Sequence, residues 1–63
     1  MIAVTRLNGQ RFVVNAELIR FVEKTPDTMI TLSSGDKFMV QESLDSVVQL
    51  AVDYHRQIRI FNT

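Results

Sequence analysis

Residue types that commonly perform chemistry are few in this chain. His55 is its single histidine, and cysteine is absent from all 63 residues. Asp53, Tyr54 and Arg56 adjoin His55 in the sequence, but residues one or two positions apart on a helix do not face each other. No catalytic dyad forms locally, a zinc site would lack ligands, and the carboxylates are not spaced as in a calcium loop. We therefore predict a protein without catalytic residues, metal or cofactor.

Arg6 and Arg11 form the charged pair with the clearest chemical consequence. If Asn8-Gly9 closes a two-residue hairpin, the two arginines lie directly opposite each other, which destabilises the strand pair unless an anion is near. That anion is a carboxylate of the chain, such as Glu17 or Glu23, an acidic surface on a partner, or a nucleic-acid phosphate. Hairpin geometry does not require arginine at position 6, so Arg6 is the foremost predicted partner-binding residue, with Arg11 beside it.

Two similar hairpins are the elements that would carry these charges. The stretch "TRLNGQRFVVN" at residues 5–15 is echoed by "TLSSGDKFMVQ" at residues 31–41. Asn8-Gly9 predicts a type I′ turn, whose two central residues both have positive φ, and Ser34-Gly35 predicts the second tight turn. The resulting register puts apolar residues on both faces of each hairpin. In the first hairpin the predicted faces are Thr5, Leu7, Phe12 and Val14 on one side, and Val4, Arg6, Arg11 and Val13 on the other.

Further strands and one helix complete the predicted elements. Ile19–Lys24 reads as a strand, and Pro26-Asp27 marks a turn before the second hairpin. Ser43 is a suitable N-cap for a helix over about residues 44–57. The tail, residues 58–63, either finishes this helix or forms a short strand. One apolar stripe follows from the spacing of three and four residues: Leu44, Val47, Val48, Ala51, Tyr54 and Ile58.

These elements predict one small domain over residues 1–63, mostly β with one C-terminal helix (α+β). Five strands within residues 1–41 form an antiparallel meander that is strongly curved or barrel-like, with the helix on one face. A domain of this size has a core that gives only marginal stability. Without disulfides or metals, self-association is the remaining source of additional stability. We therefore predict a homo-oligomer, with a monomeric small barrel as the alternative. If the tail forms a strand, its Ile58, Ile60 and Phe61 pair with an edge of a neighbouring chain.

The charge and hydropathy of the chain indicate which classes of partner it can bind. Seven Lys and Arg residues balance seven Asp and Glu residues, so the chain lacks the positive footprint of most nucleic-acid binders. No apolar run approaches the roughly 20 residues that a membrane helix needs, and no secretory signal is visible. The sequence predicts a cytoplasmic protein that does not insert into a membrane.

Several motifs together match a known family pattern over roughly residues 1–55, and the sequence departs from it after Arg56. They are "TRLNG" at Thr5–Gly9, Phe12, Asn15, Leu18-Ile19, Glu23, "TPDT" at Thr25–Thr28, "ITL" at Ile30–Leu32, Gly35, Lys37, Val40 and Glu42-Ser43. With these motifs the chain resembles the FlbD/SwrD family of small bacterial flagellar and swarming motility proteins.

The resemblance implies a non-enzymatic cytoplasmic accessory factor for flagellar motility, peripheral to the motor and acting through the stator or the flagellar assembly. It implies no residue-level binding site. Most motif residues are architectural: Asn8, Gly9, Pro26, Asp27 and Gly35 set turns, and Ser43 starts the helix. The alternative function is a small nucleic-acid-binding barrel that regulates flagellar gene expression, because such barrels share short meandering strands.

Overall fold

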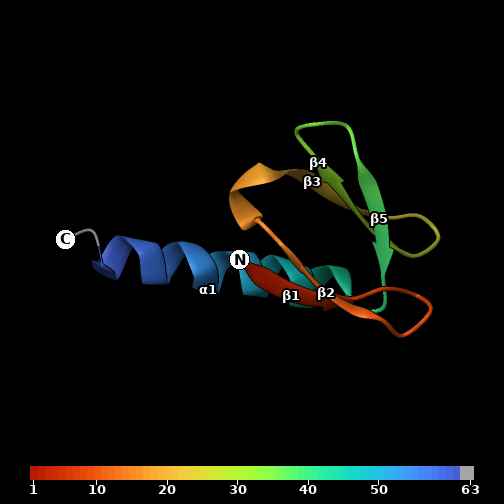
Figure 1. The fold of residues 1–63 in the computed structure, drawn as a ribbon, viewed down its shortest axis with the longest axis horizontal. Coiled ribbons are helices and arrows are strands. Elements are labelled where there is room, and N and C mark those ends of the chain that lie inside the picture. Colours follow the sequence, from red (N-terminus) through yellow and green to blue (C-terminus); the bar gives the residue numbers. More distant parts are fainter. Residues whose placement is uncertain (62–63) are drawn as a thin grey trace.

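The chain folds into two small antiparallel sheets and one long helix. The computed structural model describes the backbone of residues 1–61 and the side chains of residues 1–57. The described elements are β1 (Ile2–Thr5), β2 (Arg11–Val14), the 3-10 turn η1 (Ala16–Leu18), β3 (Ile19–Lys24), β4 (Thr28–Leu32), β5 (Lys37–Val40) and α1 (Leu44–Phe61). The sheets lie over the first part of α1, and the rest of the helix projects beyond them (Figure 1). The predicted fold class, mostly strands with one C-terminal helix, is confirmed.

Backbone hydrogen bonds join the two sheets where β1 and β5 end. Strands β1 and β2 form the first sheet, and β3, β4 and β5 form the second in that order. Arg6 and Val40 make an antiparallel bridge between the end of β1 and the end of β5, and Gln41 N donates to the Thr5 carbonyl at 2.8 Å. Across the described residues the sheets do not close into a barrel, and η1 takes the place of a β2–β3 pairing in the predicted meander.

Both hairpins turn through a longer loop than predicted. The Arg6 carbonyl accepts from Gly9 N at 2.9 Å, and Arg6 N donates to the Gln10 carbonyl at 2.8 Å. The second hairpin repeats both bonds at the same places, also at 2.9 and 2.8 Å. Gly9 and Gly35 have φ of 92° and 96°, while Asn8 keeps a negative φ. The predicted type I′ turn is therefore wrong, and a three-residue loop with one left-handed glycine takes its place.

The longer loop shifts the strand pairing by one residue. Thr5 lies opposite Arg11, Val4 lies opposite Phe12, and Ile30 lies opposite Phe38. A shift of one residue exchanges the faces of one strand relative to its partner, so the predicted faces of the first hairpin are wrong, and the two-residue register expected for the second hairpin is shifted in the same way. The inward face of the first hairpin carries Ile2, Val4, Phe12 and Val14, and its outward face carries Ala3, Thr5, Arg11 and Val13.

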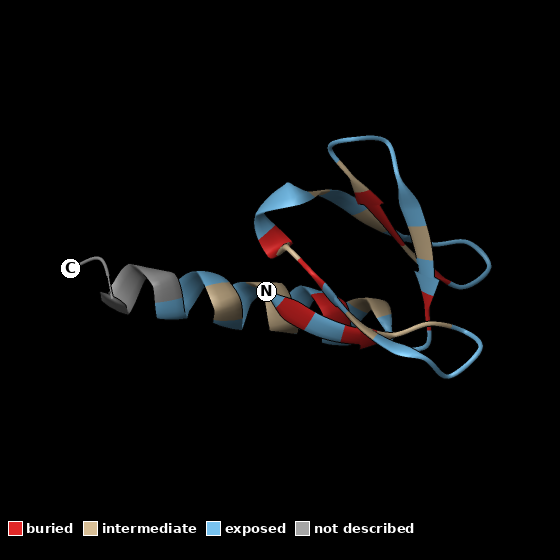
Figure 2. Cartoon of the chain, in the orientation of Figure 1, coloured by how far each residue is buried: buried red, intermediate tan, exposed pale blue. Residues whose placement is uncertain are grey.

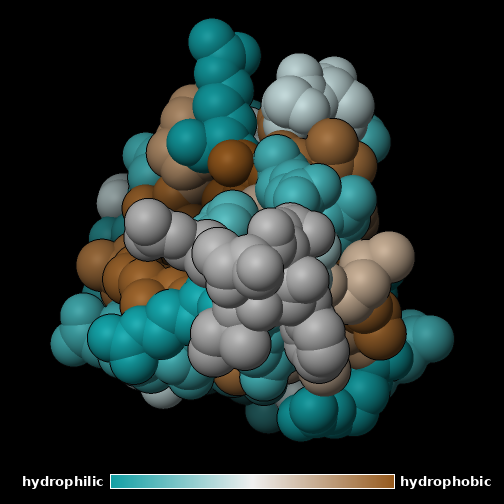
Figure 3. Space-filling model, turned by 90° about the vertical axis from the view of Figure 1, so that its left-hand side faces the viewer, coloured by the Kyte–Doolittle hydropathy of each residue, from teal (hydrophilic) through white to brown (hydrophobic). Residues whose placement is uncertain are grey.

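The hydrophobic core lies where the inward faces of both sheets meet α1 (Figure 2). Its buried members are Ile2, Val4, Val14, Ala16, Ile30, Val40 and Val47. The helix packs on β1 and β3. Val48, predicted in the same stripe as Val47, is 47% exposed, and Leu50 packs against the core instead. Apolar surface also remains around the end of the molecule from which α1 projects (Figure 3).

The predicted turn and cap residues lie where local chemistry placed them. Ser43 Oγ accepts from Ser46 N at 3.1 Å, and α1 begins directly after Ser43. Between β3 and β4, Thr25 N donates to the Asp27 carbonyl at 3.1 Å, so Pro26 and Asp27 do form a turn. The helix extends through Phe61, beyond the predicted end near residue 57. Of the two alternatives for the tail, residues 58–61 adopt the helical one.

Candidate functional site

The candidate site is the junction where the end of β1 meets the end of β5. Arg6 forms the bridge at this junction, and its side chain lies on the inward face. The Arg6 guanidinium carbon is 4.3 Å from the centroid of the Phe12 ring and 5.3 Å from that of Phe38. The two rings are 5.5 Å apart and tilted by 52°. We call Arg6, Phe12 and Phe38 the Arg6 stack; such cation–π contacts contribute about 0.5–1 kcal/mol at partly exposed sites.

The Arg6 stack leaves the donors of the guanidinium available. Between side chains of residues 1–57 a single ion pair forms, and it does not include Arg6. The guanidinium carbon lies over the faces of both rings, and the five N–H donors of an arginine lie in the plane of its guanidinium. A planar fork of donors matches a carboxylate or a phosphate in two-point contact. Arg6 is thus a partly buried cation, held in place by aromatic rings, that can bind an anion.

Arg11 lies on the opposite face of the hairpin from Arg6. This position overturns the predicted arrangement, in which the two arginines were directly opposed. Arg11 Nη1 is 3.9 Å from Glu42 Oε2 and donates to Thr5 Oγ1 at 3.4 Å. The carboxylate near Arg11 is therefore Glu42, and neither Glu17 nor Glu23, which the sequence suggested. Because the Arg11 side chain is 66% exposed, this pair contributes little to stability.

Glu42 is held mainly by Thr5. Its carboxylate accepts from Thr5 N at 2.8 Å and from Thr5 Oγ1 at 2.9 Å. Partial burial favours the neutral acid, but these hydrogen bonds, with a smaller contribution from Arg11, outweigh it and lower the pKa of Glu42 below its ordinary value. Glu42 ties the start of the helix region to β1. Sequence reasoning missed it because the two residues are 37 positions apart and no local pattern connects them.

The residues predicted for self-association lie at the end of α1. The backbone of Ile58, Ile60 and Phe61 is helical, so it does not form the joining strand that one alternative required. Their side chains lie outside the part of the chain whose side chains are described. The role of these residues in self-association stays a prediction.

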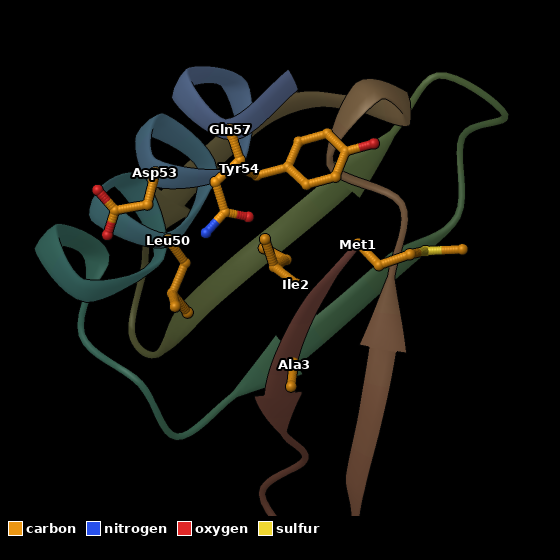
Figure 4. Close-up of a pocket in the computed structure, with 7 residues that line it drawn as sticks. All are labelled: Met1, Ile2, Ala3, Leu50, Asp53, Tyr54 and Gln57. Carbon is orange, nitrogen blue, oxygen red and sulfur yellow. The ribbon is translucent and has the colours of Figure 1, made fainter. Parts of the chain in front are cut away.

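The shallow hollows on the surface of the described residues include one beside the start of β1 and one beside the β1–β5 junction. The first, of about 290 Å³, lies between the start of β1 and α1, and Figure 4 shows its lining residues. They are Met1, Ile2, Ala3, Leu50, Asp53, Tyr54 and Gln57. The second, of about 420 Å³, lies beside the Arg6–Val40 bridge, and Leu7, Lys24, Pro26 and Thr28 are among its lining residues. Ser43 also lines the second hollow, and its hydroxyl is engaged in hydrogen bonds with Ser46.

The remaining chemical groups do not assemble into a further site within the described residues. His55 is exposed, and its ring meets the Tyr54 ring edge-on with centroids 5.6 Å apart. Residues 1–57 contain no cluster of three His, Cys, Asp or Glu side chains that could hold a metal ion. Within the described residues, no helix is both long enough and apolar enough to cross a membrane.

Comparison with known protein families shows to which family the chain belongs. The family model FlbD, described as flagellar and swarming motility proteins, matches residues 1–59. The chain belongs to the FlbD family. The match includes the Arg6 stack, Arg11 and Glu42, and it confirms the resemblance seen in the sequence motifs. No curated protein and no solved structure was found to match the chain. Membership of the FlbD family indicates a role in flagellar or swarming motility.

Proposed function

We propose that this FlbD family member is a non-enzymatic cytoplasmic adaptor that supports the flagellar motor, at the stator or the flagellar assembly, through contact with a protein partner. The observation that carries the proposal is the Arg6 stack. Its guanidinium is held by two aromatic rings at 4.3 and 5.3 Å, and no ion pair between side chains of residues 1–57 includes it, which supports binding to a partner's carboxylate. An acidic side chain of a motor or assembly protein is the proposed ligand.

A protein carboxylate suits this site better than a nucleic-acid phosphate. Nucleic-acid grooves combine several cations along a backbone path with exposed aromatic faces on which bases stack. Here the faces of Phe12 and Phe38 near the junction are taken by Arg6, Arg11 lies on the opposite face, and the chain has no net charge. One cation fixed on an aromatic support fits a single acidic residue of a partner.

Substitution of Arg6 tests this function in cells. In a strain that lacks the native gene, Arg6→Glu is expected to abolish restoration of swarming, because it places a carboxylate against the partner's carboxylate. Arg6→Gln removes the charge and is expected to reduce swarming strongly, whereas Arg6→Lys keeps the charge without the planar fork and is expected to restore it in part. Arg56→Glu, a charge reversal at an exposed helix position, is the matched control and should swarm normally.

The folded state of each variant is measured separately by thermal unfolding of the purified protein. Full swarming by Arg6→Glu and Arg6→Gln at normal protein levels would remove the Arg6 stack from the proposal. Binding to single-stranded RNA that weakens steeply with salt would instead support the nucleic-acid alternative.

A further inference from the structure

The sheet of β3, β4 and β5 has a second face that is turned away from the core and the helix (Figure 1). Directly opposed residues of neighbouring strands share a face, so the register defines its members. We call this set the outer sheet face. It consists of two rows across the three strands: Phe21, Thr31 and Lys37 in one row, and Glu23, Met29 and Met39 in the other.

The outer sheet face is apolar at its centre and along one diagonal. Phe21 is 45% exposed and Met39 is 39% exposed, while Met29 between them is partly buried. Thr31 is buried in the same face, and its hydroxyl lacks a hydrogen-bond partner among the described residues. Covering this apolar surface would be favourable in proportion to the area removed from water.

Two opposite charges lie at the other corners of the same face. Glu23 is on β3 in one row and Lys37 is on β5 in the other row, and both are exposed. The corners are separated by two strand spacings, about 10 Å, and by two residues along a strand, about 7 Å. A two-fold axis that lies in the interface and runs from Phe21 to Met39 exchanges the two charged corners. Glu23 then faces the partner's Lys37, and Lys37 faces the partner's Glu23.

We infer that the outer sheet face binds a second copy of this chain in a symmetric dimer. A two-fold interface presents the same patch twice and must be complementary to itself. The outer sheet face meets this condition because its apolar diagonal packs on itself and its two charges pair crosswise. The strands of the two sheets then cross at a steep angle, as in orthogonal sheet packing.

The small size of the chain supports a second copy as the partner that covers the outer sheet face. The core of this 63-residue chain contains seven buried apolar residues among those described, and domains this small are marginal alone. The corner residues of the outer sheet face span only about 10 Å by 7 Å, whereas a standard interface buries roughly 800 Å² per partner, so we expect a weak and reversible dimer. The Arg6 stack lies on the inward face of the fold, so the dimer leaves it free and the inference does not depend on the proposed function.

Paired charge reversals test this dimer with the full-length chain. Glu23→Lys and Lys37→Glu each place two like-charge contacts in the interface, and each alone is expected to weaken dimerisation at least about tenfold. Mixed in equal amounts, the two variants are expected to form a heterodimer with nearly the affinity of the natural chain. The reason is that the lysine introduced in one variant meets the glutamate introduced in the other. Sedimentation equilibrium of each variant and of the mixture measures these affinities.

Glu17→Lys is the matched control, since Glu17 is exposed and lies outside the outer sheet face; its dimer affinity should not change. Phe21→Ala should weaken the dimer. When it is added to both charge variants, they should still associate with each other more strongly than with themselves. A natural chain that stays monomeric at about millimolar concentration would overturn the inference. So would a mixture of the two charge variants that associates no better than either alone, or a dimer that is lost only when residues 58–63 are removed.

Discussion

At the scale of single residues, the two arginines of the first hairpin are held by different interactions. Arg6 lies on two aromatic rings, which fix its position without neutralising its charge. Arg11 lies near a carboxylate whose hydrogen bonds come mainly from Thr5. An arginine without a carboxylate nearby keeps its capacity to bind an external anion, so Arg6 and Arg11 have different roles although both occur in one short motif.

Glu42 makes the free energy of unfolding depend on pH in the acidic range. Its pKa is lowered in the folded protein, because the hydrogen bonds from Thr5 outweigh the effect of burial. The unfolded chain, with a carboxyl pKa near 4.5, therefore takes up the proton first as the pH falls. The contribution of Glu42 is complete above that pH and is lost as the pH falls through the lowered pKa of the folded state.

Replacing Glu42 with Gln tests this contribution. At pH 7, Glu42→Gln is expected to lower the free energy of unfolding by about 1 kcal/mol, because hydrogen bonds to a charged acceptor become bonds to a neutral one. Urea unfolding between pH 7 and pH 3 should show the difference shrinking as the natural protein loses stability. Exposed Glu17, changed to Gln, is the control. A difference that stays constant with pH would show that the carboxylate charge is not involved.

At the scale of elements, the two hairpins use the same turn chemistry twice. In each, the left-handed glycine follows a residue whose side chain accepts from the backbone two positions on: Asn8 Oδ1 from Gln10 N at 3.0 Å, and Ser34 Oγ from Asp36 N at 3.4 Å. The repeat in the sequence is thus a repeat of turn geometry. Only the first copy places a cation at the start of the turn, since Leu32 occupies the position equivalent to Arg6.

Alanine at either glycine should reveal this equivalence. A Cβ at Gly9 or Gly35 would meet no atom within 4 Å, so the cost comes from the positive φ alone. Each substitution is expected to lower the free energy of unfolding by about 1 kcal/mol, and the double variant by the sum, because the turns are separate. Urea unfolding measures all three variants. Ser33→Ala serves as the control, and strongly unequal effects would contradict the equivalence of the two turns.

Local signals in the sequence predicted the elements well but could not predict their register. Gly9, Gly35 and the Pro26-Asp27 pair marked the turns, and Ser43 marked the start of the helix, because each acts on its own backbone. The loop length depends on whether Asn8 adopts positive φ, and both alternatives suit Asn-Gly. That one choice moved Arg11 to the other face of the hairpin.

At the scale of the whole molecule, contacts between distant segments decided what the sequence left open. The β1–β5 junction brings Glu42 to Thr5 across 37 positions, and it brings Phe12 and Phe38 together under Arg6. The sequence motif points to Arg6 as a candidate, but no local pattern connects Phe12 with Phe38, so the aromatic support could not be predicted. The helix closes the remaining side of the core by packing on β1 and β3, so its apolar stripe stabilises both sheets at once.

Two neighbouring valines on α1 test whether the helix packs on the core in this orientation. Val47 is fully buried in the core, whereas Val48 is 47% exposed. Val47→Ala is expected to lower the free energy of unfolding by about 2 kcal/mol, through lost apolar burial and the cavity left behind, and the melting temperature by roughly 8–15 °C. Val48→Ala makes the same chemical change and should cost less than about 0.5 kcal/mol. Because Val47 lies between the helix and both sheets, fluorescence and circular dichroism should report one cooperative transition in each variant. Equal losses for the two valines would show that the helix is turned differently on the sheets.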